Sequence, residues 1–497
     1  MKPFYITTPI YYVNDKPHIG HAYTTILADV IARHHRNNGR DVFFLTGLDE
    51  HGQKVQQAAE KRGIAPKRHC DEMAPRFIEL WNTLHIQYDD FIRTTEKRHK
   101  DIVKKILQDV YEKGDIYEDN YEGLYSVSEE RFITEKEAES GDYRDIKKLK
   151  EKNYFFKMSK YQEKLVKHIE KNPKFIQPAH RKNEVLGFLK SPLSDLCISR
   201  PKSRLNWGID LPFDSEYVTY VWFDALINYV SALGFNNEET KYNTYWPANF
   251  HLIGKDILTT HSVYWPTMLM SAEIKLPESI FAHGWWLNDQ SKMSKSLGNA
   301  IDPLELIKLY GVDPVRFYLM KEMVLGHDSN FSTDSFIKCY NSDLANDFGN
   351  LLSRVSNLVN KFYNGRLVEG EDLSKNGLVI KNNAIETIED VSNLMDEMKI
   401  NDAIEKVLQF VRNVNKFLEL TAPWKVVKTD PKKAGRILFT AAESLRVIAL
   451  LFAPIMPNRA DSVMDTLNSK DKDIYWGGLA VDDKIKTHKP LFPRIEL

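Results

Sequence analysis

The sequence contains little cysteine and no long apolar run. Its 497 residues include three cysteines, Cys70, Cys197 and Cys339, and none of them belongs to a CxxC pair. This spacing argues against a disulfide framework and favours a reducing compartment. The sequence contains no stretch of about 18 apolar residues, so no membrane span is expected. The N-terminus, MKPFYITTPIYY, lacks the charged lead and apolar core of a secretory signal. We therefore expect a cytoplasmic protein.

The chain also lacks an excess of charge of either sign. Its formal net charge is -1, so the composition gives no indication of a nucleic-acid partner, and any RNA-binding surface must be a local patch. The apolar fraction of 42% is ordinary for a globular protein with a full core. A length of 497 residues predicts about two to four domains.

Alternating strand and helix patterns fill the first part of the chain. They predict a strand at 4–8, a helix from His18 to Gly39, a strand buried on both faces at 41–46, a loop at 47–52 and a helix at 53–62. A βαβ unit of a Rossmann-like parallel sheet is the simplest fold with this order.

The pattern changes twice further along the chain. From 117 to 214 the segments are short and densely charged, which indicates an inserted α+β domain. Strand-then-helix order returns at 217–221 and 250–254, so the insertion splits one α/β domain. After 334 the sequence predicts an all-α helical bundle, with helical stretches at 344–362, 384–420 and 433–452.

The tetrapeptide His18-Ile19-Gly20-His21 closes the first βα loop and opens a helix. A phosphate at this position would meet helix N-terminal amides and two imidazole donors, and Gly20 would let a ligand ring approach the backbone. Two alternatives remain for the histidines. They could simply cap the helix, or they could bind a metal, although no third ligand is fixed beside them.

A second polar loop, Lys292-Met-Ser-Lys-Ser296, lies far away in the sequence. Two lysines three residues apart suit transient binding of a polyphosphate whose charge grows in the transition state. Taken alone, such a lysine pair is more simply interpreted as part of a solvated basic loop without a ligand. The two motifs together, in this order around a split α/β domain, are far more specific than either.

The chain resembles the class I aminoacyl-tRNA synthetases, whose HIGH and KMSKS signatures are matched by 18–21 and 292–296. Within that class it is similar to the methionyl-tRNA synthetases along almost its whole length. The matching segments are TPIYYVN at 8–14, TGLDEHG at 46–52, ISRPK at 198–202, YVWFDA at 220–225 and HLIGKD at 251–256.

The resemblance implies roles for these parts. It implies that Asp49 holds the substrate α-ammonium and that Arg200 lies near the substrate carboxylate, while the methionine side chain contacts Ile10, Tyr12, Trp222, Ala225, Tyr229, Ile257 and His261. It implies that ATP, with Mg²⁺ on its phosphates, binds at His18, Gly20, His21, Gly254, Asp256, Lys292 and Lys295. The catalytic residues would be His18, His21, Lys292 and Lys295.

The helical part carries the residues that match the family's anticodon readers, Asn350, Arg354 and Trp424. Asn and Arg one helical turn apart can hydrogen-bond unstacked bases, and an exposed indole can stack on one. Without the resemblance, Trp424 would be interpreted as a core or capping residue. The expected domains are catalytic halves at 1–116 and 215–280, a connective insertion at 117–214, a KMSKS-loop and stem-contact region at 281–333, and an anticodon-binding domain at 334–497.

The sequence departs from the family in its inserted domain. Many relatives carry zinc knuckles built from CxxC pairs, whereas Ser126 and Glu129 stand at the matching positions here. We expect no zinc and a knuckle region held by packing alone. The chain ends soon after the bundle, without the extra C-terminal domain through which some relatives dimerise, so we expect a monomer.

Three alternatives stay open at this point. The chain could be a class I synthetase for leucine, valine or cysteine, although the insertion is short for an editing domain and the cysteine enzyme needs thiolate ligands. It could be a nucleotidyltransferase with a HIGH-type loop, which would leave the bundle unexplained. It could also be a non-catalytic tRNA-binding relative, against which the intact histidines and lysines argue.

Overall fold

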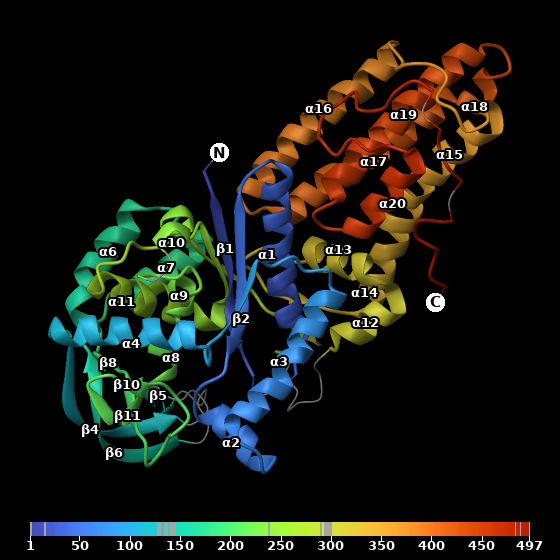
Figure 1. Cartoon of the computed structure of the whole chain (residues 1–497). Coiled ribbons are helices and arrows are strands. Elements are labelled where there is room, and N and C mark those ends of the chain that lie inside the picture. Colours follow the sequence, from blue (N-terminus) through green and yellow to red (C-terminus); the bar gives the residue numbers. More distant parts are fainter. Residues whose placement is uncertain are drawn as a thin grey trace. The chain divides into compact units, whose positions relative to one another are not determined.

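The computed structural model describes residues 2–13, 16–126, 131–133, 138–139, 146–236, 239–288, 291–292, 301–482, 484–487 and 489–496. These residues form two compact units (Figure 1). The first contains Met1–Pro17, Gly39–Asn82 and Ile86–His283, and the second contains His18–Asn38, Thr83–His85 and Gly284–Leu497.

A parallel six-stranded sheet forms the centre of the first unit. Its strand order is β3 (Asp90–Arg93), β2 (Val42–Asp49), β1 (Phe4–Tyr12), β12 (Phe250–Gly254), β13 (Ile280–His283) and β7 (Ile176–Gln177). All five pairings are parallel. Every residue of β2 is buried, as its continuous apolar run predicts for a strand covered on both faces. The expected Rossmann-like α/β fold is confirmed.

The strands differ from the sequence prediction at their ends. β1 continues to Tyr12, where a loop was expected from Pro9, and its register with β2 shifts between Thr7 and Ile10. Proline has no N–H for the ladder, so pairing resumes only beyond it. β2 likewise continues to Asp49, and β7 is a strand that the sequence did not predict.

The inserted segment forms the expected α+β structure. Its long strands β4 (Ile116–Ser126) and β6 (Ile146–Phe156) pair antiparallel and lie side by side in Figure 1. β5 (Arg131–Ile133) and β8 (Leu196–Cys197) complete that sheet, and β9 (Ser199–Pro201), β10 (Asp210–Leu211) and β11 (Asp214–Thr219) form a second one. The helices of the first unit are α2 (Gln53–Lys61), α3 (Pro66–Thr83), α4 (Lys97–Glu112), α6 (Gln162–Lys171), α7 (Ala179–Phe188), α8 (Val221–Ala225), α9 (Asn228–Ser231), α10 (Glu239–Tyr245) and α11 (Trp265–Ser271).

The second unit is mainly helical. It contains a small sheet of β14 (Trp286–Asn288), β15 (Ser291–Lys292) and β16 (Ser329–Asn330). Its helices are α1 (Ile19–Asn37), α12 (Pro303–Tyr310), α13 (Val312–Glu322), α14 (Thr333–Cys339), a π-helical segment (Tyr340–Gly349), α15 (Asn350–Tyr363), α16 (Lys375–Asp396), α17 (Ile400–Thr421), α18 (Pro423–Val426), α19 (Pro431–Phe452) and α20 (Pro457–Leu467). Figure 1 shows α16, α17 and α19 running side by side, which confirms the predicted bundle. Among the described residues, no helix has both the length and the apolar composition to cross a bilayer.

The expected helical stretch at 384–420 is wrong as a single element. It consists of α16 and α17, which are separated at 397–399. Met398 turns the chain with a φ of 62°. Neither glycine nor proline marks this break, so no local residue pattern predicts it.

The helix α1 groups with the second unit, although it lies between β1 and β2 in the sequence. Arg316 on α13 is completely buried and donates to Asp29 of α1 at 2.6 Å. The same guanidinium donates to the carbonyl oxygens of Leu84, Pro454 and Ile455 at 3.0, 2.9 and 2.8 Å. One side chain therefore joins α1, the short segment around Leu84 and the end of α19.

Arg316→Met should lower the free energy of unfolding by about 3–5 kcal/mol, because it leaves the buried Asp29 carboxylate without this partner. Arg436→Met is the control, since Arg436 is 40% exposed and lies 3.8 Å from Glu369. Such a surface pair contributes about 0–1 kcal/mol. Urea unfolding of both variants measures the difference. Equal losses would show that the Arg316 cluster is not a special source of stability.

Candidate active site

The topology of the parallel sheet indicates where a ligand binds in the first unit. The chain leaves β1 toward β2 and β3 on one side, and later adds β12 and β13 on the other. In open parallel sheets, ligands bind outside the carboxyl ends of the strands where the order reverses. Tyr12, Asp49 and Gly254 are the last residues of β1, β2 and β12. Three residues predicted from separate motifs thus lie at the expected edge.

Tyr229 and His261 form a buried, hydrogen-bonded pair next to β12, which carries His251. The Tyr229 hydroxyl lies 2.8 Å from Nε2 of His261, and Nδ1 of His261 lies 3.0 Å from the carbonyl oxygen of Ile257. Because a carbonyl only accepts, Nδ1 carries the ring proton, so Nε2 accepts from the tyrosine. The Tyr229 ring also packs against the ring of His251, tilted by 30° and with the centroids 4.1 Å apart, and Nδ1 of His251 lies 2.8 Å from the Thr7 hydroxyl.

Burial keeps the rings of this region uncharged. It lowers the pKa of His261 to about 4, and it lowers the pKa of His251 well below its ordinary value. It raises the pKa of Tyr229 far above the neutral range. The lining is therefore aromatic, polar at defined atoms and neutral at pH 7, which suits an uncharged side chain rather than a charged one.

The other residues predicted to line the side-chain pocket lie around the same core. Ala225 is buried at the end of α8, four residues before Tyr229. Ile10, Trp222 and Ile257 are partly buried and pack against the hydrophobic cluster that contains Tyr229. Tyr12 is partly buried at the end of β1. The tertiary structure therefore gathers residues from three separated segments of the sequence.

A buried carboxylate that the sequence analysis did not select holds two of the motifs together. Asp224 accepts from His51 at 2.6 Å and from His99 at 2.7 Å, and His99 also contacts the Ser231 hydroxyl at 2.8 Å. Burial by itself raises the pKa of Asp224, but the two imidazoles outweigh it and lower the pKa to about 2. His51 and Asp224 stand inside TGLDEHG and YVWFDA, so their presence in both motifs was the available signal.

Arg200 and Asp49 are buried in this unit with 2% and 4% exposure. Arg200 lies on β9, donates to the carbonyl oxygen of Ser199 at 2.6 Å and lies 4.4 Å over the Tyr220 ring. Asp49 is paired in register with Tyr12. A buried carboxylate at a strand end suits a ligand ammonium, which would neutralise it.

Gly254 lies directly after the buried part of β12. A β-carbon there would lie 2.5 Å from Oδ1 of Asp256, closer than real β-carbons approach. Only glycine leaves the Asp256 carboxylate in this position. Asp256 itself is exposed, so its carboxylate is accessible from solvent.

His18 and His21 lie in the second unit and cap the start of α1. Nδ1 of His18 accepts from the backbone of Gly20 at 3.1 Å, and Nδ1 of His21 accepts from the backbone of His18 at 3.2 Å. The rings stack with centroids 3.9 Å apart. Because both Nδ1 atoms accept, each neutral ring carries its proton on Nε2. Capping therefore fixes the tautomer that a phosphate-binding imidazole needs.

The lysines of the second motif are only partly described. The backbone of Lys292 forms the end of β15, and Lys295 lies outside the described residues. Their roles stay predictions. The knuckle position Glu129 also lies outside the described residues, whereas Ser126 is the last residue of β4 and is buried.

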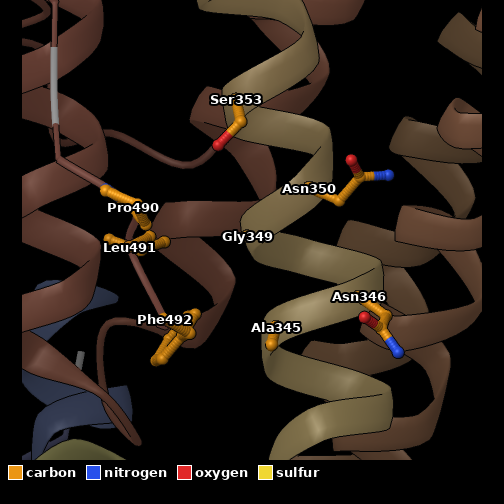
Figure 2. Close-up of a pocket in the computed structure, with 8 residues that line it drawn as sticks. All are labelled: Ala345, Asn346, Gly349, Asn350, Ser353, Pro490, Leu491 and Phe492. Atoms are coloured by element: carbon orange, nitrogen blue, oxygen red, sulfur yellow. The ribbon is translucent and has the colours of Figure 1, made fainter. Parts of the chain in front are cut away.

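The three residues predicted to read the anticodon lie on α15 and α18. The Arg354 guanidinium lies 5.7 Å from the Trp424 ring centroid, so residues 70 positions apart in the sequence lie together. Arg354 also donates to Asn415 at 3.3 Å. Asn350 is exposed and borders a cavity of about 400 Å³. Figure 2 shows its amide pointing away from Pro490, Leu491 and Phe492, which border the cavity on the other side.

Comparisons with known proteins identify the family. The model for class I tRNA synthetases of the M type matches residues 4–141 and 138–356, and the model for the anticodon-binding domain of methionyl-tRNA ligase matches 368–489. The chain belongs to the class I methionyl-tRNA synthetases. It is 46% identical to a methionine–tRNA ligase of Fusobacterium nucleatum over all of this chain and 80% of that protein.

Two further comparisons agree with this family. A methionine–tRNA ligase of Rickettsia conorii is 46% identical over 93% of this chain and 92% of that protein. The structure of Mycobacterium tuberculosis methionyl-tRNA synthetase in complex with methionyl-adenylate is 38% identical and superposes with a TM-score of 0.96, covering 99% of this chain and all of that one. The resemblance found in the motifs is thus confirmed, and the fold extends over the whole length.

The buried His261 predicts a pH dependence of stability. Its pKa is about 4 in the folded protein and 6.5 in its ordinary state, so the unfolded chain binds more protons between these values. The free energy of unfolding should be level above pH 6.5 and should fall as the pH drops toward 4, by up to about 1.4 kcal/mol per pH unit for this group.

The His261→Gln variant should flatten that slope by about 1 kcal/mol per pH unit. His180→Gln, which changes an exposed histidine, is the matched control and should keep the wild-type slope. Urea unfolding at several pH values between 4.5 and 7.5 gives the slopes. An unchanged slope in His261→Gln would contradict the neutral, buried imidazole.

Proposed function

We propose that this chain is a methionine–tRNA ligase. It activates L-methionine with ATP to methionyl-adenylate and pyrophosphate, and then transfers methionine to the 3′-terminal adenosine of tRNA(Met). Membership of the methionyl-tRNA synthetases supports this reaction, as does the likeness to a relative that was solved with methionyl-adenylate. The observation that carries the choice of amino acid is the buried, neutral Tyr229–His261 pair.

Methionine's side chain is an unbranched, uncharged thioether. Sulfur gains from contact with aromatic rings, and an uncharged lining avoids the cost of burying an unpaired charge beside it. Tyr229 and His261 satisfy each other's polar atoms, so neither needs a polar group on the substrate. Trp222, Ala225, Ile257, Ile10 and Tyr12 complete the proposed contacts of this side chain.

The polar end of methionine needs opposite charges. The Asp49 carboxylate is the proposed partner of the α-ammonium, and Arg200 is the proposed basic group near the carboxylate. Charge-assisted hydrogen bonds of this kind are among the stronger contacts in a binding site. The Asp224 network positions the segment that carries Asp49, because His51 belongs to the same loop.

Adenylate formation needs little acid–base chemistry. An oxygen of the methionine carboxylate, already an anion, forms a bond to the α-phosphorus of ATP, and the bond from that phosphorus to pyrophosphate breaks. The protein must orient the reactants and neutralise growing negative charge. His18 and His21 are proposed to do this through Nε2–H donors, together with Lys292 and Lys295. Mg²⁺ enters as part of the ATP complex.

The nucleoside part of ATP is proposed to contact Gly20, Gly254 and Asp256. Asp256 is the proposed acceptor for a ribose hydroxyl. In the second step, a ribose hydroxyl of the tRNA's last adenosine attacks the methionyl carbonyl, and AMP leaves. Asn350, Arg354 and Trp424 are proposed to recognise the anticodon. The expected monomer and the cytoplasmic location belong to the same proposal.

Amino-acid-dependent exchange of pyrophosphate into ATP tests the first step without tRNA. We expect exchange with methionine alone among the twenty amino acids. Asp49→Asn should lose roughly 10- to 150-fold in kcat/KM for methionine, because it removes a hydrogen bond to a charged group. Asp101→Asn, at a half-exposed surface carboxylate that pairs with Lys97, should match the wild type.

Each other result has a definite meaning. Exchange with a different amino acid would still indicate a class I aminoacyl-tRNA synthetase, but it would overturn the assignment of the methionine pocket. The absence of exchange with any amino acid, together with the absence of tRNA charging, would favour the non-catalytic tRNA-binding alternative. Exchange that is unaffected in Asp49→Asn would remove Asp49 from the site.

Trp424→Ala tests the anticodon surface. Loss of one base–aromatic stack costs about 1–3 kcal/mol, so charging of tRNA should fall roughly 5- to 150-fold in kcat/KM while pyrophosphate exchange stays near wild type. Trp476→Ala is the matched control, since Trp476 is also partly exposed in the second unit. Equal losses in both reactions would make Trp424 a structural residue rather than a reader.

A further inference from the structure

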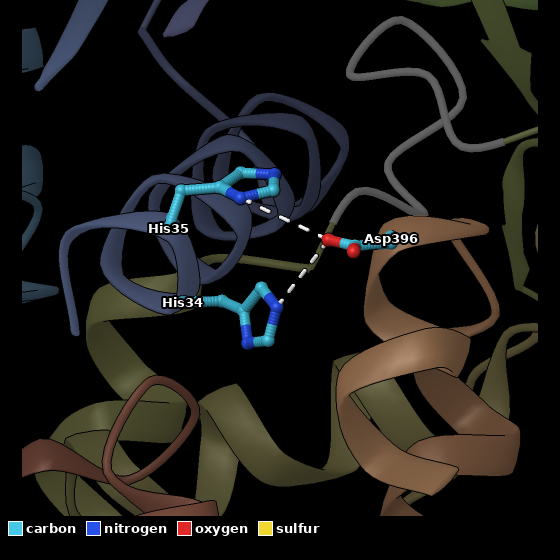
Figure 3. A group of neighbouring side chains, drawn as sticks. All are labelled: His34, His35 and Asp396. Carbon is cyan, nitrogen blue, oxygen red and sulfur yellow. Dashed lines mark ion pairs between the residues drawn. The ribbon is translucent and has the colours of Figure 1, made fainter. Parts of the chain in front are cut away.

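Two buried histidines and a carboxylate meet at the ends of two helices of the second unit. His34 and His35 lie in the last turn of α1, and Asp396 is the last residue of α16. Figure 3 shows both imidazoles pointing toward the Asp396 carboxylate. His34 and His35 are neighbours in the sequence, at the opposite end of α1 from His18 and His21, whereas Asp396 lies far away in the sequence on α16.

The spacing of their atoms does not fit hydrogen bonds. Oδ1 of Asp396 lies 3.6 Å from Nε2 of His34 and 3.8 Å from Nδ1 of His35. Hydrogen bonds between such atoms are about 2.7–3.2 Å long. Ligands that share a tetrahedral zinc ion at 2.0–2.1 Å stand about 3.4 Å apart. The two measured distances are within a few tenths of an ångström of that value, and all three ligand atoms lie within 4.8 Å of one another.

The hydrogen bonding of His34 points to a cation. The Asn38 side-chain amide donates to Nε2 of His34 at 3.2 Å, so this nitrogen presents its lone pair. The nearby Asp396 oxygen also presents lone pairs, and two acceptors at this distance repel each other. A bound metal ion would accept both, with the Asn38 amide turning away from the imidazole.

The burial of the three side chains also fits a metal site. The imidazoles of His34 and His35 are only 8% and 6% exposed, which fixes their positions, whereas the Asp396 carboxylate is 58% exposed. An ion could therefore enter from solvent past the carboxylate and keep water at its remaining position. Two imidazoles with one carboxylate suit Zn²⁺ and its neighbours, while Mg²⁺ and Ca²⁺ prefer oxygen ligands.

We propose that His34, His35 and Asp396 form a binding site for a divalent transition metal of the zinc type, which ties the end of α1 to the end of α16. The site differs from a zinc knuckle, because it uses no cysteine and lies in the other unit. It departs from the sequence-based expectation that the protein holds no zinc, while the loss of the knuckle itself stays a prediction. Since the ion binds only when both helices are folded, it stabilises the second unit.

The test uses the full-length protein without a histidine tag, stripped of metal with a chelator. Titration with Co²⁺, followed by visible absorption and calorimetry, should show one site. His35→Asn and Asp396→Asn each remove a ligand of the metal. Changing a residue that only supports a ligand lowers metal affinity roughly 10- to 100-fold, so each of these variants should lose more than that in Co²⁺ affinity. Zn²⁺ should raise the melting temperature of the wild type and leave that of His35→Asn unchanged.

Two controls separate this site from others. His180→Asn removes an exposed histidine and should bind Co²⁺ like the wild type. His18→Asn should also keep the site, which excludes the stacked pair at the start of α1 as the ligands. Metal-free His35→Asn should melt like the metal-free wild type; if it does not, Asp396→Asn, at an exposed position, provides the binding test.

Several results would overturn the proposal. One is the absence of Co²⁺ absorption in the wild type, which would leave the cluster as an ion pair at a helix end. Another is binding that survives in both His35→Asn and Asp396→Asn. Zinc that copurifies in equal amounts with the wild type and His35→Asn would instead place it elsewhere, and would contradict the expected loss of the knuckle as well.

Discussion

The second unit depends on one buried guanidinium. Arg316 is surrounded by the Asp29 carboxylate and three backbone carbonyl oxygens, so all sides of its charge are compensated inside a core that excludes water. A charge buried this deeply is tolerable only with such partners, and these partners come from three separate parts of the chain. The interaction therefore fixes α1, the segment at Leu84 and the end of α19 relative to one another. It also explains why α1, which follows β1 directly, groups with helices that come hundreds of residues later.

The first unit contains a comparable group with the opposite central charge. Asp224 is buried between His51 and His99, and these contacts hold the loop after β2 against α8 and α4. Among the residues proposed to bind methionine, Trp222 and Ala225 lie on α8 and Asp49 lies at the end of β2. Other protein groups position two further residues of this site: the backbone carbonyl of Ile257 fixes the tautomer of His261, and the ring of His251, against which Tyr229 packs, is contacted by Thr7 and Trp265. The residues of the proposed methionine site are thus ordered without a ligand, which would reduce the ordering cost of binding.

Local interactions prepare the proposed phosphate site in the same way. His18 and His21 cap α1 through their Nδ1 atoms and are proposed to bind phosphate through Nε2–H. The two roles are compatible because they use different nitrogens of each ring. At the proposed anticodon surface, Arg354 lies over Trp424 and also bonds to Asn415. An arginine held by neighbours loses less freedom on binding a base than one that moves in solvent. In each case, the function is assigned to an atom whose neighbours already fix its orientation.

The sequence by itself determined the fold class and the family. Strand and helix periodicity depends on neighbours a few residues away, and the motifs are contiguous, so both can be read along the chain. It also selected Tyr229, His261, Asp49 and the capping histidines as candidate site residues, and these assignments stay predictions. Tertiary structure alone decided which distant groups meet: Asp29 with Arg316, Asp224 with two histidines, Arg354 with Trp424, and Asp396 with His34 and His35. It also decided the break at Met398 and the place of α1 in the second unit. The reason is that burial and pairing of charged groups depend on long-range packing, which leaves no periodic or contiguous signal in the sequence.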